Sequence, residues 1–325
     1  MARMTNALFI LAYPQELRNR YVDGLRTAFP GLNVNVVDHH SKVGPYIGNA
    51  DVLLTFGPMM AEHVAAAAPN LKWIQVLGTG TDGVSNSKSV RPEVIVTKVH
   101  GIQGAAMSEA ALAAMLALSR DFVRSVRCQE RQSWERWPVG LLQGKTVGVL
   151  GVGAVAQALA PRCKAMGMTV VGISSVPREV AGFDRILPRG ELAEAIGQFD
   201  FLVVLIPLSA ETRNIVNAEL LASMKPTSYL INLARGDVVD EAALIRALEQ
   251  GQIAGAALDV FSQEPVPKGH PLWSAKNLIM TPHLGGFHDR YVDDVLPLVV
   301  ENMRCFLAGD VRNMSGLVQA GEGSP

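Results

Sequence analysis

The sequence is poor in the residues that build disulfide scaffolds and metal centres. Its 325 residues include only three cysteines, Cys128, Cys163 and Cys305, which lie far apart and show no C-x-x-C spacing. This pattern excludes a disulfide framework and a zinc site, and it indicates a reducing compartment. Most histidines also lack the spacing of metal ligands, so we predict no metal and expect loop or surface roles for them. These are His39, His40, His63, His100, His270 and His288.

Long apolar runs and blocks of like charge are absent as well. The first apolar stretch, residues 7–12, is too short for a signal peptide or a membrane span. The 29 basic and 30 acidic residues give a formal charge of -1 and form no run of one sign. This balance argues against nucleic acid or an anionic membrane as a partner. We therefore expect a soluble cytoplasmic protein.

What the sequence does contain is a repeated alternation of short apolar runs and longer segments of helical period. That alternation is typical of parallel strands joined by crossover helices. The chain also exceeds the roughly 250 to 300 residues at which a single core stops growing, which predicts two α/β domains. In the first part, strands are expected at residues 7–11, 33–37, 52–55, 73–76 and 94–97, with helices near 15–28 and 61–67.

The pattern restarts in the second part of the chain. Strands are expected there at residues 146–150, 169–173, 201–206, 229–232, 255–260 and 278–281, with a helix at 154–166. This run predicts a doubly wound Rossmann nucleotide-binding domain beside a smaller flavodoxin-like α/β domain. One helix at 107–127 precedes it, and a last amphipathic helix at 289–307 is expected to return to the first domain. The predicted domains are 1–103 with 287–325, and 104–286.

A glycine-rich loop opens the second domain. Gly151-Val152-Gly153-Ala154-Val155-Ala156 follows an apolar strand and precedes a helix, the context in which such a loop binds a dinucleotide. Gly151 permits the tight turn, Gly153 lets the backbone approach a pyrophosphate, and the helix N-terminus at Ala154 and Val155 supplies amide donors. The loop predicts that residues 104–286 bind a nicotinamide cofactor. An ordinary glycine turn is the alternative.

The acidic residue that holds the ribose 2′-hydroxyl of NAD is missing. It is expected about 20 residues after the loop, at the end of the second strand. Ser174, Ser175 and Arg178 stand there instead. No carboxylate repels a 2′-phosphate at this position, and a guanidinium would form a charge-assisted contact with it. We therefore favour NADP over NAD, with a solvated loop role for Arg178 as the alternative.

Three polar side chains follow three predicted strands of the second domain. Arg235, Glu264 and His283 each come shortly after an apolar run. Such strand ends meet at one edge of a parallel sheet, where ligands bind. A carboxylate beside an imidazole supports an acid/base pair, and reduction of a 2-oxo acid needs a proton donor and a cation. Taken singly, each residue also suits an ordinary salt bridge, turn or loop role.

These segments resemble the signature blocks of the D-2-hydroxyacid dehydrogenases, among them the glyoxylate and hydroxypyruvate reductases. The resemblance implies that His283 is the proton donor, Glu264 its partner, and Arg235 the anchor for the substrate carboxylate and carbonyl. Ala156 in place of the third glycine and Ser174 in place of an acid depart from the pattern. The matching blocks are residues 151–156, 232–240, 259–265 and 281–286, and the spacings fit from about 71 to 313.

The resemblance also implies further contacts. The loop Gly78-Thr79-Gly80-Thr81-Asp82 resembles the one whose amides hold the substrate carboxylate, so Thr79 and Gly80 are expected contacts. A plain turn is the alternative for these glycines. Asp259 resembles a residue near the nicotinamide carboxamide, although it also suits a turn cap. The residues expected to line the cofactor are Pro207, Leu208, Thr212, Leu233, Ala234, Asp259 and Gly285.

We therefore expect an oxidoreductase that reduces a small 2-oxo acid, such as glyoxylate or hydroxypyruvate, to the D-2-hydroxy acid. A homodimer is the default expectation, because a helix such as the one at 107–127 often packs a dimer or crosses between domains, although a plain core helix fits the same pattern. Trp134 and Trp137 either pack internally or reach a neighbouring subunit, as aromatics here can in the family. A cofactor-sensing corepressor is one alternative, which the Arg, Glu and His set disfavours. A formate dehydrogenase is another, but Glu264 stands where that branch resembles Gln.

Overall fold

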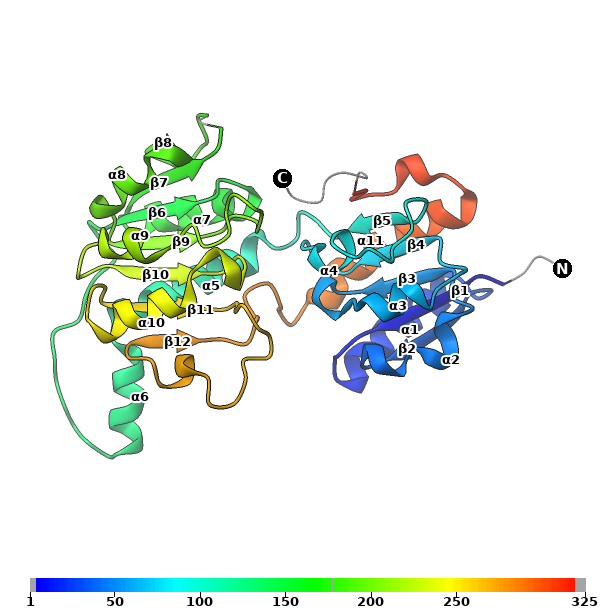
Figure 1. Cartoon of the computed structure of the whole chain (residues 1–325), viewed down its shortest axis with the longest axis horizontal. Coiled ribbons are helices and arrows are strands. Elements are labelled where there is room, and N and C mark those ends of the chain that lie inside the picture. Colours follow the sequence, from blue (N-terminus) through cyan, green and yellow to red (C-terminus); the bar gives the residue numbers. More distant parts are fainter. Residues whose placement is uncertain (1–3, 177, 319–325) are drawn as a thin grey trace. The chain divides into compact units, whose positions relative to one another are not determined.

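The structure is a computed structural model that describes residues 4–176 and 178–318. The chain forms two compact units. The first unit consists of Met1–Ile102 and Asp289–Pro325, and the second unit of Gln103–His288. Each unit has its own parallel sheet with helices on both faces, so the predicted α/β fold class is confirmed (Figure 1).

The sheet of the first unit has five strands in the order β2-β1-β3-β4-β5 within the described residues. This is the flavodoxin-like strand order. The strands are β1 Asn6–Ile10, β2 Asn33–Val37, β3 Val52–Thr55, β4 Trp73–Val76 and β5 Ile95–Lys98. The helices are α1 Gln15–Ala28, α2 Gly44–Ile47, α3 Glu62–Ala66, α4 Asp82–Ser85 and α11 Tyr291–Ala308.

Alternate residues of the first-unit strands enter two different cores. In β1, Ala7 and Phe9 belong to the core formed with α1 and α11, whereas Leu8 and Ile10 belong to the core formed with α2 and α3. Successive strand side chains point to opposite faces, so a strand covered on both sides has to be apolar throughout. That requirement is why the central strands β1 and β3 read as nearly continuous apolar runs.

The sheet of the second unit has seven parallel strands in the described chain, in the order β12-β11-β10-β9-β6-β7-β8. The order reverses beside β6, the first strand of the unit, as in a doubly wound Rossmann sheet. The strands are β6 Thr146–Leu150, β7 Thr169–Ser174, β8 Arg185–Pro188, β9 Phe201–Val204, β10 Tyr229–Asn232, β11 Gly255–Leu258 and β12 Leu278–Met280. The helices are α5 Gly104–Ser119, α6 Phe122–Glu130, α7 Ala154–Ala165, α8 Leu192–Ala195, α9 Ala218–Ala222 and α10 Glu241–Glu249.

The prediction of a single helix at 107–127 is wrong. Two helices, α5 and α6, stand in its place, and α5 begins three residues earlier at Gly104. Asp121 adopts left-handed backbone with φ of 49°, which ends α5 and redirects the chain. An aspartate tolerates this conformation better than most residues do, so the break carries little cost.

Strand β8 was not predicted, and several strand ends were placed too far along the chain. β8 is a half-exposed edge strand that ends in Pro188. Its short sequence, Arg185 to Pro188, contains a proline and a charged residue, a composition typical of a loop. β9 ends at Val204 and β11 at Leu258, two residues before the expected ends. In both cases the apolar run continues into a buried loop, which the pattern does not distinguish from the strand.

Candidate active site

The glycine-rich loop connects β6 to α7 at the point where the strand order reverses. Gly151 has φ of +100°, and a Cβ there would lie 2.6 Å from Ile206 Cγ2. A Cβ at Gly153 would meet no atom within 4 Å, so the start of α7 is open to a ligand. Ala156 is fully buried, as the small third residue of the loop should be. The first N–H groups of a helix have no partner within it, so this loop fits a pyrophosphate.

A guanidinium lies against this loop. Arg178 Nη2 donates a hydrogen bond to the Val152 carbonyl at 2.9 Å, and no ion pair engages Arg178 among residues 4–176 and 178–318. Ser174 ends β7, and Ser175 beside it is exposed. The sequence predicts that Arg178 lies near Ser174 and Ser175 only because these residues are neighbours along the chain. The hydrogen bond to Val152 adds a connection to the phosphate loop itself.

The loop after β9 contains three of the residues expected to line a cofactor. Pro207 is exposed and Leu208 is half-buried, whereas Thr212 is only 3% exposed. The Thr212 hydroxyl donates to the Pro207 carbonyl at 2.7 Å and accepts from the Ser209 N–H at 2.7 Å. Thr212 therefore shapes the loop from within, whereas Leu208 packs partly against the core and Pro207 is exposed.

Arg235 lies on a tight turn directly after β10. The buried side chain of Asn232 braces this turn, since its amide donates to the Arg235 carbonyl at 2.9 Å and its oxygen accepts from the Ala234 N–H at 3.0 Å. Leu233 and Ala234 are buried beside it. A Cβ at Gly236 would lie 1.9 Å from the Phe261 carbonyl carbon, so only glycine lets this turn pack on the segment leading to Glu264.

Glu264 and His283 form a hydrogen-bonded pair in the second unit. His283 Nδ1 lies 2.7 Å from Glu264 Oε2, and Glu264 Oε1 accepts from the Phe261 N–H at 2.9 Å. Their side chains are 29% and 41% exposed, for Glu264 and His283 respectively. The contact uses Nδ1 of His283, and no hydrogen bond to Nε2 is found in the described part of the chain.

Electrostatics keep Glu264 ionised. Burial by itself raises the pKa of Glu264, but hydrogen bonds from His283 and the Phe261 N–H, with the charges of His283 and Arg235, outweigh it. The net result holds the pKa below its usual range. An ionised Glu264 accepts a hydrogen bond from the proton on His283 Nδ1, which fixes the orientation of the imidazole ring. Arg235 is close enough to contribute to this field, so the three predicted residues do come together.

Asp259 holds the loop that carries His283. Its carboxylate accepts from the N–H groups of Leu284 at 2.8 Å and Gly285 at 2.7 Å, and from the Thr281 hydroxyl at 2.5 Å. The His283 N–H donates to the Asp259 carbonyl at 2.8 Å. These bonds sustain left-handed backbone at His283, with φ of 55°, a conformation that a histidine adopts at some cost. Both carboxylate oxygens of Asp259 are thus used within the loop.

Glu241 is a contributor that the sequence did not reveal. Its two carboxylate oxygens accept from the N–H and the hydroxyl of Ser262, both at 2.7 Å. Glu241 begins α10 and Ser262 follows β11, so this clamp fixes the segment between Asp259 and Glu264. The available signal, an acidic residue beside the helix cap Asp240, indicated a helix start and nothing about its distant partner.

Thr79 and Gly80 belong to the first unit, where they follow β4. Thr79 is exposed and Gly80 is half-buried. A Cβ at Gly57 would lie 2.6 Å from the Gly80 carbonyl oxygen, and a Cβ at Gly83 would lie 2.0 Å from the Gly57 carbonyl oxygen. The backbone of this loop therefore packs closely against the 3₁₀ turn Gly57–Met59, which fixes the position of the loop within the first unit.

The remaining features concern the cysteines, possible metal sites and possible membrane spans in the described residues. The three cysteines are buried and free. No group of three or more His, Cys, Asp or Glu side chains in the described chain is arranged to hold a metal. Likewise, no described helix is both long and apolar enough to cross a membrane.

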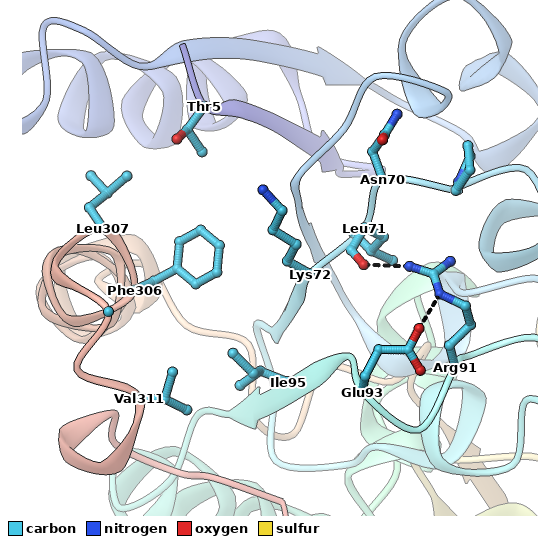
Figure 2. Close-up of a pocket in the computed structure, with 12 residues that line it drawn as sticks. Thr5, Asn70, Leu71, Lys72, Arg91, Glu93, Ile95, Phe306, Leu307 and Val311 are labelled. Carbon is cyan, nitrogen blue, oxygen red and sulfur yellow. Dashed lines mark hydrogen bonds and ion pairs between the residues drawn. The ribbon is translucent and has the colours of Figure 1, made fainter. Parts of the chain in front are cut away.

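A hollow of about 590 Å³ lies in the first unit near the amino ends of β1, β4 and β5. Figure 2 shows Lys72 pointing into it beside Phe306. Lys72 pairs with Asp51 at 3.1 Å and Arg91 with Glu93 at 2.7 Å, so the charges here already have partners. The hollow is at the opposite strand ends from the Thr79 loop.

Comparisons with known proteins identify the family. The family model described as D-isomer specific 2-hydroxyacid dehydrogenase, NAD binding domain, matches residues 112–285. The glyoxylate reductase of Pyrococcus furiosus is 32% identical over 275 residues, which cover 82% of each chain. The chain therefore belongs to the D-isomer specific 2-hydroxyacid dehydrogenase family, and the resemblance noted in the sequence is confirmed.

Solved structures of this family superpose on nearly the whole chain. The D-isomer specific 2-hydroxyacid dehydrogenase of Xanthobacter autotrophicus, in complex with NADPH and MES, is 31% identical with a TM-score of 0.80, covering 99% of this chain and 100% of that one. The D-lactate dehydrogenase of Aquifex aeolicus, complexed with NAD and lactic acid, is 25% identical with a TM-score of 0.86, covering 98% and 100%. Solved relatives thus hold either cofactor.

Proposed function

We propose that this protein reduces a small 2-oxo acid, such as glyoxylate or hydroxypyruvate, to the D-2-hydroxy acid with a nicotinamide cofactor. The observation that carries the proposal is the 2.7 Å contact between Glu264 and His283, with the Arg235 charge acting on the same carboxylate. This is a proton donor beside a cation, at the strand ends of a unit whose glycine loop fits a pyrophosphate.

The residues of the chain account for proton transfer and charge stabilisation. A bound NAD(P)H would supply the hydride to the carbonyl carbon. His283 gives the proton on Nε2 to the carbonyl oxygen, and ionised Glu264 stabilises the imidazolium through Nδ1 before that transfer. Arg235 binds the substrate carboxylate and stabilises the negative charge that grows on the carbonyl oxygen. In the first unit, the amides of Thr79 and Gly80 are proposed to bind substrate, as the family resemblance implies.

A substrate panel tests the proposal. Glyoxylate, hydroxypyruvate and pyruvate are assayed with NADPH and with NADH, and formate oxidation is assayed with both oxidised cofactors. Turnover of at least one 2-oxo acid with a D-configured product, where a stereocentre forms, is expected. Tight cofactor binding without turnover of any of them would instead favour a cofactor-sensing protein, and formate oxidation alone would favour a formate dehydrogenase.

For the cofactor, we propose that NADPH is preferred and that Arg178 pairs with its 2′-phosphate beside Ser174 and Ser175. The support is the position of the guanidinium on the Val152 carbonyl, next to the phosphate loop. Arg178→Gln is expected to raise KM for NADPH by about 10- to 100-fold, as loss of a charge-assisted hydrogen bond does, with KM for NADH unchanged. Steady-state kinetics with each cofactor measure this.

Arg185→Gln is the matched control for Arg178. Arg185 lies on the neighbouring strand β8, where its guanidinium donates to Gln198, so its loss should leave both KM values unchanged. A wild-type preference for NADH, or an equal rise of both KM values in Arg178→Gln, contradicts the proposal.

We also propose a homodimer that forms through α6 and the segment after it. Figure 1 shows this part extending away from the sheet of the second unit. Its side chains Phe122, Leu141 and Trp134 are 60%, 59% and 94% exposed. They lie in the same unit as a hollow of about 510 Å³ whose lining includes Leu116, Leu141 and Met166. Leu141 is both exposed and part of this lining, and exposed apolar side chains of this kind suit a self-complementary contact between two copies.

Trp134→Ser is expected to weaken this dimer. Loss of an aromatic anchor commonly costs about 2 kcal/mol or more, so the dimer dissociation constant should rise by about 30-fold. Sedimentation equilibrium measures it. Trp273→Ser, which removes another exposed tryptophan of the second unit, should leave the constant unchanged. A wild-type protein that stays monomeric at micromolar concentration, or an unaltered constant in Trp134→Ser, overturns the proposal.

A further inference from the structure

Tyr291 is tied to the start of the Thr79 loop. It is the first residue of α11 and is only 3% exposed. Its hydroxyl donates a hydrogen bond to the Leu77 carbonyl at 2.7 Å, in a buried position. Leu77 directly precedes Gly78, so this bond holds the chain at the point where it leaves the sheet and enters the loop.

The remaining anchors of this loop come from the backbone and from an aromatic ring. The Leu77 N–H donates to the Thr55 carbonyl at 2.8 Å, and the Val99 N–H donates to the Gly78 carbonyl at 3.1 Å. A Cβ at Gly78 would lie 3.4 Å from the ring of Phe56, so that ring closes on the glycine. The Leu77 carbonyl, by contrast, depends on a side chain from a different part of the sequence.

Two neighbouring rings fix the position of that side chain. The Phe56 ring lies 6.2 Å from the Tyr291 ring and 5.4 Å from the Tyr13 ring, centroid to centroid. The phenol of Tyr291 is therefore packed as well as hydrogen-bonded, and its hydroxyl has little freedom to move. A rigid donor of this kind defines where the loop begins.

We propose that the Tyr291 hydroxyl is a positioning group for substrate, because it sets the Thr79–Gly80 backbone that binds the substrate carboxylate. The proposal rests on the proposed function, which assigns that substrate contact to the loop. Without the hydroxyl, a buried carbonyl loses its donor and the adjoining loop shifts to find another. Substrate binding then weakens, whereas the Glu264 and His283 pair and the phosphate loop, both in the second unit, keep their own hydrogen bonds.

The test compares Tyr291→Phe with Tyr21→Phe. Tyr21 belongs to the same core, is fully buried, and its hydroxyl has no hydrogen-bond partner in the described residues. Each variant removes one buried phenol oxygen, but only Tyr291→Phe removes the hydrogen bond to Leu77. In Tyr291→Phe, KM for the 2-oxo acid is expected to rise by about tenfold, with kcat within about twofold of wild type. In Tyr21→Phe both values should stay at the wild-type level.

Cofactor affinity and thermal unfolding, measured on the same samples, separate positioning from general damage. The dissociation constant of NADPH, from quenching of tryptophan fluorescence, should be unchanged in both variants. An unchanged KM in Tyr291→Phe overturns the proposal, and so does a parallel loss of kcat and cofactor affinity. If the wild-type protein reduces no 2-oxo acid, the proposed function fails together with this inference. If wild type is active and only the Tyr291 effect is missing, this inference fails alone.

Discussion

Replacement of His283 by Asn is expected to lower kcat by about 10³-fold, within the range found for loss of a general acid. Nε2 of His283 is the atom proposed to protonate the carbonyl oxygen, and asparagine has no group that gives up a proton near neutral pH. Asparagine also tolerates left-handed backbone, so the loop that Asp259 holds at φ of 55° should persist. Steady-state turnover of the preferred 2-oxo acid measures the loss.

Cofactor binding and a second histidine complete that experiment. The NADPH dissociation constant should stay at the wild-type value, because the phosphate loop is a separate part of the second unit. His270→Asn is the control, since His270 caps the 3₁₀ turn Pro271–Ser274 by accepting from the Leu272 N–H, and asparagine caps equally well. Near-normal turnover in His283→Asn would remove this residue from the mechanism.

The fold was predictable because burial on both faces of a parallel sheet leaves a direct record in the sequence. β2, β3, β4, β6 and β10 begin and end at the predicted residues. The phosphate loop and the three strand-end residues were predictable for a related reason. A parallel sheet collects its strand carboxyl ends at one edge, so residues that follow different strands lie near one another without any local signal.

What could not be predicted are contacts that join distant segments through single side chains. The hydrogen bond from Arg178 to Val152, the clamp of Glu241 on Ser262 and the bond from Tyr291 to Leu77 leave no periodic trace. The hydrogen bonds of the Thr212 hydroxyl within its own loop leave no periodic trace either, and its contact with a cofactor stays a prediction from the family resemblance. The break at Asp121 could not be predicted for another reason. The segments on both sides of it have helical patterns, and a change of direction at a single residue does not interrupt such a pattern.

Substitution of Arg235 tests the other half of the proposed chemistry, and Arg235→Lys is the most informative change. The lysine keeps the positive charge but loses the planar pair of N–H donors that matches a carboxylate. We expect kcat/KM for the 2-oxo acid to fall by about 10² to 10³-fold, as it does when one donor to a developing oxyanion is removed. Arg235 has ordinary extended backbone, with φ of -142°, so the turn braced by Asn232 should survive Arg235→Lys and also Arg235→Gln.

Arg235→Gln removes the charge as well and adds a pH signature. Burial raises the pKa of Glu264, and its hydrogen bonds together with the charges of His283 and Arg235 lower it. Removal of the Arg235 charge therefore raises that pKa, and the acidic limb of the kcat/KM profile should move to higher pH, because the reaction needs ionised Glu264. Arg213→Gln, which breaks an exposed ion pair with Asp237 in the same unit, should shift neither the limb nor the rate. An unmoved limb and wild-type kcat/KM in Arg235→Gln would mean that this guanidinium neither binds substrate nor acts on Glu264.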